Sequence, residues 1–145
     1  MAQSFPKVKI IAVGKVKKAW LRSGIAVYTQ RLPEVEIVEI KDADPEREAA
    51  KLQSLLQAQD MLILMAEEGQ SFNSIQLAKW LGQQASGRLT FFIGGPAGIS
   101  PSLKQQTRQQ ISLSAMTFPH ELARLMLLEQ LYRAKTILQG SRYHK

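Results

Sequence analysis

Three short and almost entirely apolar runs constrain the fold of this chain more than any other feature. They are VKIIAVG at residues 8–14, MLILM at 61–65 and LTFFI at 89–93. Runs of this kind are typical of β-strands covered on both faces, as in a parallel sheet flanked by helices. Two further strands are predicted, an alternating one at 35–40 and another at 111–116.

Helical patterns fill the intervals between these predicted strands. They cover residues 19–32, a segment capped by Asp44 and opened by Pro45, 75–85 after a Ser74 cap, 101–109, and 119–138. Strands that alternate with helices predict the α/β class, with a mostly parallel sheet and helices on both faces. At 145 residues the chain has the length of one domain, residues 1–145, with room for a substantial core.

Composition narrows the possible chemistry. The chain has no cysteine, which excludes disulfides, thiolate metal ligands and a cysteine nucleophile. Its two histidines, His120 and His144, are too few for a zinc site without carboxylate help, so we expect no metal. No apolar run reaches the ~18 residues of a membrane helix, and the N-terminal segment lacks the pattern of a signal peptide. We therefore expect a soluble, cytoplasmic protein.

The positive charge of the chain is unevenly distributed. The formal net charge is +7, and residues 1–31 hold seven basic residues and no acidic one. Residues 119–145 hold five basic residues against Glu121 and Glu129. Clustered positive charge suits a polyanionic partner such as RNA, although solvated lysines on an ordinary surface would produce the same count.

Loops that follow the strands are the places to search for a ligand site, because parallel sheets bind ligands at the carboxyl ends of their strands. Neither a G-x-G-x-x-G fingerprint nor a P-loop occurs. Three segments are candidates: IGGPAGIS at 93–100, MAEEGQSF at 65–72 and SLSAMTF at 112–118. Glycines allow close backbone approach to a ligand. Each segment is also compatible with an ordinary turn or with a core strand that leads into a helix.

The last predicted helix is apolar over more of its circumference than a surface helix needs. It is either buried on most sides or part of a subunit interface. Arg124, Glu129 and Arg133 are compatible with a ladder of ion pairs on its surface, since Glu129 and Arg133 are four residues apart.

Taken in order, several of these segments resemble one known family. IGGPAG, LSAMTFPHELARLMLLEQLYRA and a terminal YHK, with KIIAVGKVKKAW and LILMAEEGQSF upstream, are similar to the RlmH-type rRNA methyltransferases of the SPOUT superfamily. The resemblance begins near Lys7, which leaves residues 1–6 as an N-terminal extension. It implies an α/β fold with a C-terminal trefoil knot and a homodimer formed through the C-terminal helix. It also implies methylation of N3 of a pseudouridine in 23S rRNA, with S-adenosylmethionine as the methyl donor.

The resemblance also implies where the cofactor binds, held in the knot largely by backbone groups. The implied residues come from all three candidate segments: Met65, Gly94, Leu113, Ser114, Ala115, Met116, Thr117 and Phe118. Because the cofactor carries its own reactive methyl group, the protein needs to supply shape and orientation rather than a nucleophile. The plain composition of SLSAMTF fits that task.

The acceptor nitrogen must lose its proton during methylation. Either a base removes that proton, or nearby cations stabilise the negative charge that develops on the flanking carbonyls. The candidates for these roles are His120, Arg133, Arg142, Tyr143 and His144. His144 lies in a tail with no core to fill, which favours a catalytic or positioning role over a structural one. His120 follows Pro119 at a helix start, where a structural role is equally open.

Two alternatives remain at this level. A non-enzymatic RNA- or ribosome-binding α/β protein would explain the charge, but not the glycine-rich IGGPAGIS segment together with SLSAMTF. A SPOUT methyltransferase with another RNA target would explain both. The chain has no appended RNA-binding domain, which favours a substrate whose surroundings provide much of the recognition, such as the assembled 70S ribosome.

Overall fold

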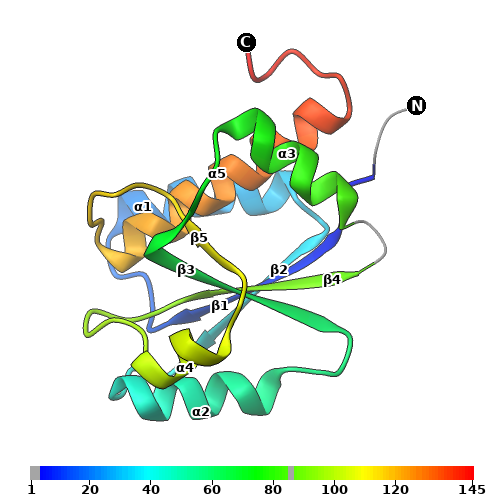
Figure 1. The fold of residues 1–145 in the computed structure, drawn as a ribbon. Helices are drawn as coiled ribbons and strands as arrows, with labels where there is room; N and C mark the ends of the chain where they lie inside the picture. The colour runs from blue at the N-terminus through cyan, green and yellow to red at the C-terminus, as the bar shows by residue number, and fades with distance from the viewer. Residues whose placement is uncertain (1–3, 85–86) are drawn as a thin grey trace.

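A single parallel sheet forms the centre of the molecule. The structure, a computed structural model, describes residues 4–84 and 87–145, so residues 1–3 of the predicted extension and Ala85 at the predicted end of the third helix lie outside it. The strands are β1 (Lys7–Val13), β2 (Val35–Ile40), β3 (Asp60–Ser71), β4 (Arg88–Ile93) and β5 (Gln110–Ser112). They lie in the order β2-β1-β4-β3-β5, and every pairing is parallel (Figure 1).

Helices cover both faces of this sheet (Figure 1). One face carries α1 (Ala19–Arg31), α3 (Ser74–Gln83) and α5 (His120–Leu138), and the other carries α2 (Pro45–Leu55) and α4 (Pro101–Gln106). The predicted α/β class, with its parallel sheet and two helical layers, is confirmed.

Neighbouring residues of one strand explain why the apolar runs are continuous. Ile10 and Phe91 pack into the core beneath α3 and α5, whereas Ile11 and Phe92 pack into the core against α2. All four side chains are at most 1% exposed. Successive strand residues point to opposite faces, so a strand covered on both faces needs an apolar residue at every position.

The third strand is longer than the sequence predicts. The pattern of residues 66–72 predicts a loop, but β3 continues to Ser71 and pairs with β5 on both sides of a bulge between Met65 and Gln70. Gly69 makes this possible, because a Cβ atom there would lie 2.6 Å from the backbone carbon of Gln110. Only glycine permits two backbones to approach so closely.

The fifth strand is shorter than predicted. Residues 111–116 were expected to be extended, but β5 ends at Ser112. Two serines turn the chain: the Ser112 hydroxyl donates to the Ser114 carbonyl at 2.9 Å, and the Met116 N–H donates to the Ser114 hydroxyl at 3.0 Å. Serine side chains compete with strand pairing in this way by bonding to nearby backbone.

Helix ends follow local hydrogen bonds. Asp44 caps α2 as predicted, accepting from the Arg47 N–H at 2.9 Å. The cap of α3 is Asn73 rather than Ser74, because Asn73 and Gln76 form a reciprocal capping box. The predicted helix at 101–109 stops at Gln106, where the Gln110 amide donates to the carbonyl oxygens of Lys104 and Thr107.

Arg124 is not on the surface of α5, which corrects the predicted ladder. It is 2% exposed, and its guanidinium binds Glu39 at 2.6 Å and the Gly14 carbonyl at 3.0 Å. These contacts fix α5 to the ends of β1 and β2. The other predicted pair is confirmed, since Arg133 and Glu129 lie 2.7 Å apart.

Candidate active site

A cavity of about 810 Å³ lies at the carboxyl ends of the central strands. Three segments line most of it: 65–68 in β3, most of 93–99 from the end of β4 onward, and much of 113–119 after β5. His120 and Ala123, from the first turn of α5, and Lys104 complete the lining. The three candidate loops are therefore brought together, and the cavity has the size of a typical small-molecule site. The segment after β5 meets the other two here, which is consistent with the predicted C-terminal knot.

Most of the residues predicted to bind the cofactor line this cavity. They are Met65, Gly94, Leu113, Ser114, Met116, Thr117 and Phe118. Ala115 lies on the same turn but is exposed, and it is not among the lining residues. Met116 is 73% exposed, so the segment forms the lip of the cavity as well as its wall.

The loop after β4 has a shape that depends on glycine. Gly95 and Gly98 pair across a tight turn, in which the Gly98 N–H donates to the Gly95 carbonyl at 3.0 Å. Gly98 has a φ of +86°, which L side chains rarely adopt. At Gly94, a Cβ atom would lie 2.8 Å from Cγ1 of Ile99. At its glycines the loop therefore presents bare backbone to the cavity, beside the side chains of Pro96 and Ile99.

Charged residues that the sequence analysis did not single out also line the cavity. Glu67 accepts a hydrogen bond from the Thr117 hydroxyl at 2.8 Å, which ties the lip to β3. Glu68 pairs with Lys104 at 2.6 Å, and this hydrogen bond lowers the pKa of the Glu68 carboxyl. The sequence feature that could have revealed Glu67 and Glu68 as cavity residues is their position as adjacent glutamates in MAEEGQSF, directly after a buried apolar run.

The lining fits S-adenosylmethionine. Among the described lining residues, Lys104 is the only Lys or Arg, and Glu68 already pairs with it. A ligand with a positive sulfonium therefore meets apolar walls, backbone groups and the Glu67 carboxylate rather than an unpaired ammonium or guanidinium. The described residues contain no group of three or more His, Asp or Glu side chains that could hold a metal ion.

His120 faces the cavity from the first turn of α5. The next residue, Glu121, accepts from the Lys17 N–H at 2.7 Å, and this bond lowers the pKa of the Glu121 carboxyl. The contact fixes the start of α5 to the segment between β1 and α1. The structure thus places His120 at the cavity, where either of its predicted roles is available.

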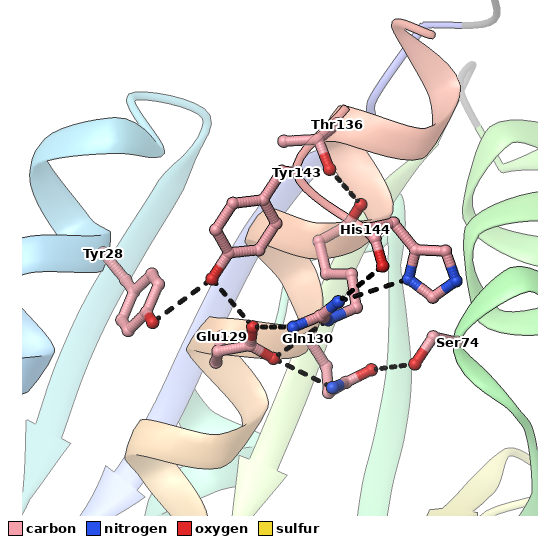
Figure 2. Close-up of polar contacts among 8 residues, drawn as sticks. Tyr28, Ser74, Glu129, Gln130, Thr136, Tyr143 and His144 are labelled. Carbon is pink, nitrogen blue, oxygen red and sulfur yellow. Dashed lines mark hydrogen bonds and ion pairs between the residues drawn. The ribbon is translucent and has the colours of Figure 1, made fainter. Parts of the chain in front are cut away.

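The remaining predicted residues gather at the other end of α5. We call Tyr28, Glu129, Arg133, Tyr143 and His144 the tail cluster, of which Figure 2 labels all but Arg133. Glu129 is its hub, since it accepts from the Arg133 guanidinium at 2.7 Å and from the Tyr143 hydroxyl at 2.9 Å. Tyr143 also lies 3.4 Å from the Tyr28 hydroxyl.

These contacts determine the charges in the tail cluster. Hydrogen bonding to Tyr28, burial and the neighbouring Glu129 carboxylate raise the pKa of the Tyr143 phenol far above its ordinary value. The hydrogen bond to Glu129 raises the pKa of Arg133 as well. Tyr143 is therefore a neutral hydrogen-bond donor and Arg133 a permanent cation across the physiological range.

The contact between Arg133 and His144 determines which ring nitrogen of the histidine carries hydrogen. The Arg133 guanidinium lies 3.2 Å from His144 Nδ1. Arginine can only donate, so Nδ1 must accept and the hydrogen of the neutral ring lies on Nε2. In this arrangement the Nε2–H of His144 is available as a hydrogen-bond donor. The ring's one lone pair, on Nδ1, already accepts from Arg133.

The cavity and the tail cluster are far apart within one chain. His120 and Arg133 are thirteen residues apart on α5, which corresponds to about 20 Å at the ordinary helical rise. Arg142 is exposed beside the tail cluster, and its carbonyl accepts from the Lys145 N–H at 3.1 Å. A single chain thus brings the predicted cofactor residues together but does not bring the predicted catalytic tail to them.

Comparison with known proteins shows the family to which this chain is similar. The family model described as "Predicted SPOUT methyltransferase" matches residues 7–144. A "Ribosomal RNA large subunit methyltransferase H" of Synechococcus sp. (strain RCC307) is 51% identical over 139 residues, covering 96% of this chain and 95% of that protein. Its namesake from Prochlorococcus marinus (strain MIT 9303) is 52% identical over 137 residues, covering 94% and 91%.

The fold is a parallel α/β sheet with a cavity lined by β3 and by the segments after β4 and β5, the arrangement of an α/β ligand-binding protein, and the comparisons identify the family. The chain belongs to the SPOUT methyltransferase family. The family resemblance inferred from the sequence is confirmed, and a purely RNA-binding, non-enzymatic role is not supported.

Proposed function

We propose that this protein methylates N3 of a pseudouridine in 23S rRNA within the assembled 70S ribosome, using S-adenosylmethionine and acting as a homodimer. The observation that carries the proposal is the joining of three chain segments, with most of the predicted cofactor residues, around one cavity. The rRNA target follows the names of relatives that are about half identical over nearly the whole chain.

The chain's own residues prepare the cofactor end of the reaction. S-adenosylmethionine, when bound, supplies an electrophilic methyl group on its sulfonium. The glycine loop and the turn at Ser114 offer backbone hydrogen-bonding groups, while Met65 and Phe118 provide apolar walls. Shape and backbone groups of this kind orient a ligand without adding a side chain that could react with it.

The tail cluster suits the acceptor end. Loss of the imide proton to solvent places negative charge on the ring nitrogen and its flanking carbonyls, before that nitrogen accepts the methyl group. Arg133 is a permanent cation, and His144 presents a donor at Nε2. This arrangement favours charge stabilisation over removal of the proton by His144. Of the two routes that the sequence left open, we therefore propose stabilisation of the developing negative charge for the tail.

A second subunit would bring the two ends together. In a two-fold dimer formed through α5, the tail cluster of one chain can face the cavity of its partner. Exposed lysines between β1 and α1, Lys15, Lys17 and Lys18, would contact rRNA phosphates beside that composite site.

No helix of the described residues is long and apolar enough to cross a membrane. Ribosomes as substrate place the enzyme in the cytoplasm.

Transfer of a labelled methyl group tests the reaction. Substrates would be 70S ribosomes, separated subunits and naked 23S rRNA, all from cells that lack the modification. We expect label on 70S rRNA at N3 of a pseudouridine, and none with the Gly94→Trp variant. Label at another base or another RNA would replace the substrate proposed here. If no substrate is labelled and calorimetry detects no cofactor binding, the proposal fails.

Mixed dimers test the shared site. Gly94→Trp and Arg133→Ala chains would be inactive alone. A random mixture should recover about a quarter of wild-type activity, because half the dimers contain one site with both intact parts. No recovery, with mixed dimers verified by mass spectrometry, would show that each site is built within a single chain.

A further inference from the structure

The outer side of the glycine loop, residues 94–100, rests on the first turn of α2. The inner side of this loop faces the cavity through Gly94, Pro96 and Ile99. Behind it lie the carboxylates of Glu46 and Glu48, neither of which is among the lining residues. In the sequence both glutamates are explained by the positive end of a helix dipole, which requires no contact with another loop.

Glu48 holds the start of the glycine loop. It is 3% exposed, and its Oε2 accepts from the Ala43 N–H at 3.1 Å. Burial raises the pKa of this carboxyl, and the backbone of Ala43 and Gly95 opposes that shift. A Cβ atom on Gly95 would lie 3.2 Å from Oε2 of Glu48 and 3.0 Å from Cγ1 of Val13, so the loop is seated directly on both side chains.

Glu46 holds the end of the same loop. The hydroxyl of Ser100, which is 1% exposed, donates to Glu46 Oε1 at 2.7 Å. Ser102 donates to the other carboxylate oxygen at 3.3 Å. Ser100 also caps α4 by accepting from the Leu103 N–H at 3.3 Å. Both ends of the glycine loop are thus tied to one rigid helical turn.

We propose that Glu48 and Glu46 are positioning residues for cofactor binding, which hold the glycine loop in its binding shape from outside the cavity. The inference rests on the proposed use of S-adenosylmethionine. Loops rich in glycine lose more conformational freedom on ordering than other segments. A loop that is already fixed has less of that entropy left to lose when a ligand binds.

Four variants separate positioning from general stability. Glu48→Ala removes the clamp, and Glu48→Gln keeps an acceptor oxygen for Ala43 and Gly95. Glu46→Ala alters an exposed residue and guards against misfolding of Glu48→Ala. Asp44→Ala is the matched control, because it weakens the same helix through its cap without touching the glycine loop.

Calorimetric titration with S-adenosylmethionine gives the first readout. We expect Glu48→Ala to weaken binding about tenfold and Glu46→Ala by a smaller factor, with Glu48→Gln close to wild type. Asp44→Ala should lower the unfolding temperature and leave the dissociation constant unchanged. Wild-type affinity in folded Glu48→Ala, or an equal loss in Asp44→Ala, would overturn the proposal.

Hydrogen–deuterium exchange of residues 94–100 gives a second readout that needs no ligand. Glu48→Ala and Glu46→Ala should speed exchange in this loop, whereas Asp44→Ala should speed it only in the first turn of α2. If wild-type protein bound no S-adenosylmethionine, the proposed function would fail, and the exchange data would still decide whether the clamp exists. Unchanged exchange in both glutamate variants would show that Glu46 and Glu48 do not hold the loop.

Discussion

The cavity and the tail cluster, at opposite ends of α5, are built in different ways. The cavity is formed by three segments of one chain and shaped by glycines, backbone turns and apolar walls. The tail cluster is a network of charged and aromatic side chains around Glu129 (Figure 2). One region is suited to hold a ligand by shape, and the other to stabilise charge. Selective damage to each should therefore have separable effects on binding and turnover.

Gly94→Trp should have the largest effect. The cavity wall has no space for a side chain here, because even a Cβ atom would lie 2.8 Å from Ile99. We expect loss of detectable cofactor binding and a fall in methyl transfer of more than about a hundredfold. Calorimetry and initial rates measure these. Gly87→Ala is the control, since its Cβ would make only an ordinary contact at 3.7 Å.

Arg133→Ala should separate the two regions most clearly. Turnover should fall roughly a hundredfold because the cation proposed to face the developing negative charge is gone. The dissociation constant for S-adenosylmethionine should not change. Lys135→Ala, which removes the pair with Glu34 at 2.9 Å on the same helix, is the control. A matching loss of cofactor affinity in Arg133→Ala would show that the two regions are one.

His144 distinguishes donor from base. If Nε2–H donates to the substrate, Gln supplies a comparable N–H, so His144→Gln should keep most activity while His144→Ala loses about tenfold. The pH–rate profile of His144→Gln should follow that of the wild type. If His144→Gln instead lost one limb of the wild-type pH–rate profile, His144 would be assigned as the base.

The pH dependence of thermal stability tests Glu48, which lies behind the glycine loop and outside the cavity. Burial, with the nearby Asp42 carboxylate, raises the pKa of Glu48 above its ordinary value of 4.5, despite the opposing Ala43 and Gly95 N–H groups. A raised folded-state pKa stabilises the fold below the unfolded value, and this contribution is lost as pH rises through the folded value. Glu48→Gln should therefore match wild type near pH 4 and unfold at higher temperature than wild type near pH 7.

Glu68→Gln provides a comparison of opposite sign. Lys104 lowers the pKa of Glu68, so the ionised carboxylate stabilises the fold above its unfolded pKa, and this contribution is lost as pH falls through the folded pKa. The effect should be small, because the Glu68 side chain is 57% exposed. Thermal unfolding of both variants across this pH range would reveal the two signs.

Tyr28→Phe should have the smallest effect. It removes a long contact of 3.4 Å to Tyr143, while the 2.9 Å bond from Tyr143 to Glu129 stays in place. Turnover should change by less than about twofold, since weak neutral hydrogen bonds contribute little. Tyr143→Phe, which removes both contacts, should have a larger effect. Equal effects would mean that Tyr28 holds the tail as firmly as Glu129 does.

The sequence predicted the parts of the fold that depend on local pattern. Apolar runs such as 89–93 marked strands buried on both faces, and Asp44 with Pro45 marked a helix start that the structure confirms. The family resemblance predicted that residues from three separate segments form one cofactor site. Most of these residues line the cavity, and their roles stay a prediction.

Features that depend on distant contacts were not predictable in this way. The extension of β3 depends on the approach of Gly69 to Gln110, which is 41 positions further along the chain. Arg124 looked like a surface residue because its partners, Glu39 and Gly14, are more than eighty residues away. Glu48 was interpreted through its own helix alone. In each case a neighbour in space, absent from the local pattern, decides the role.

The length of α5 has a consequence for how this protein can change. In the proposed dimer the length of this helix sets the distance between the tail of one chain and the cofactor cavity of the other. Inserting four residues, about one turn, would move the tail by roughly 6 Å and rotate it by about 40°. Even if the core of one subunit repacked around that change, the tail would no longer meet the cavity of its partner. The number of turns in α5 would then be set by chemistry between two copies rather than by the folding of one.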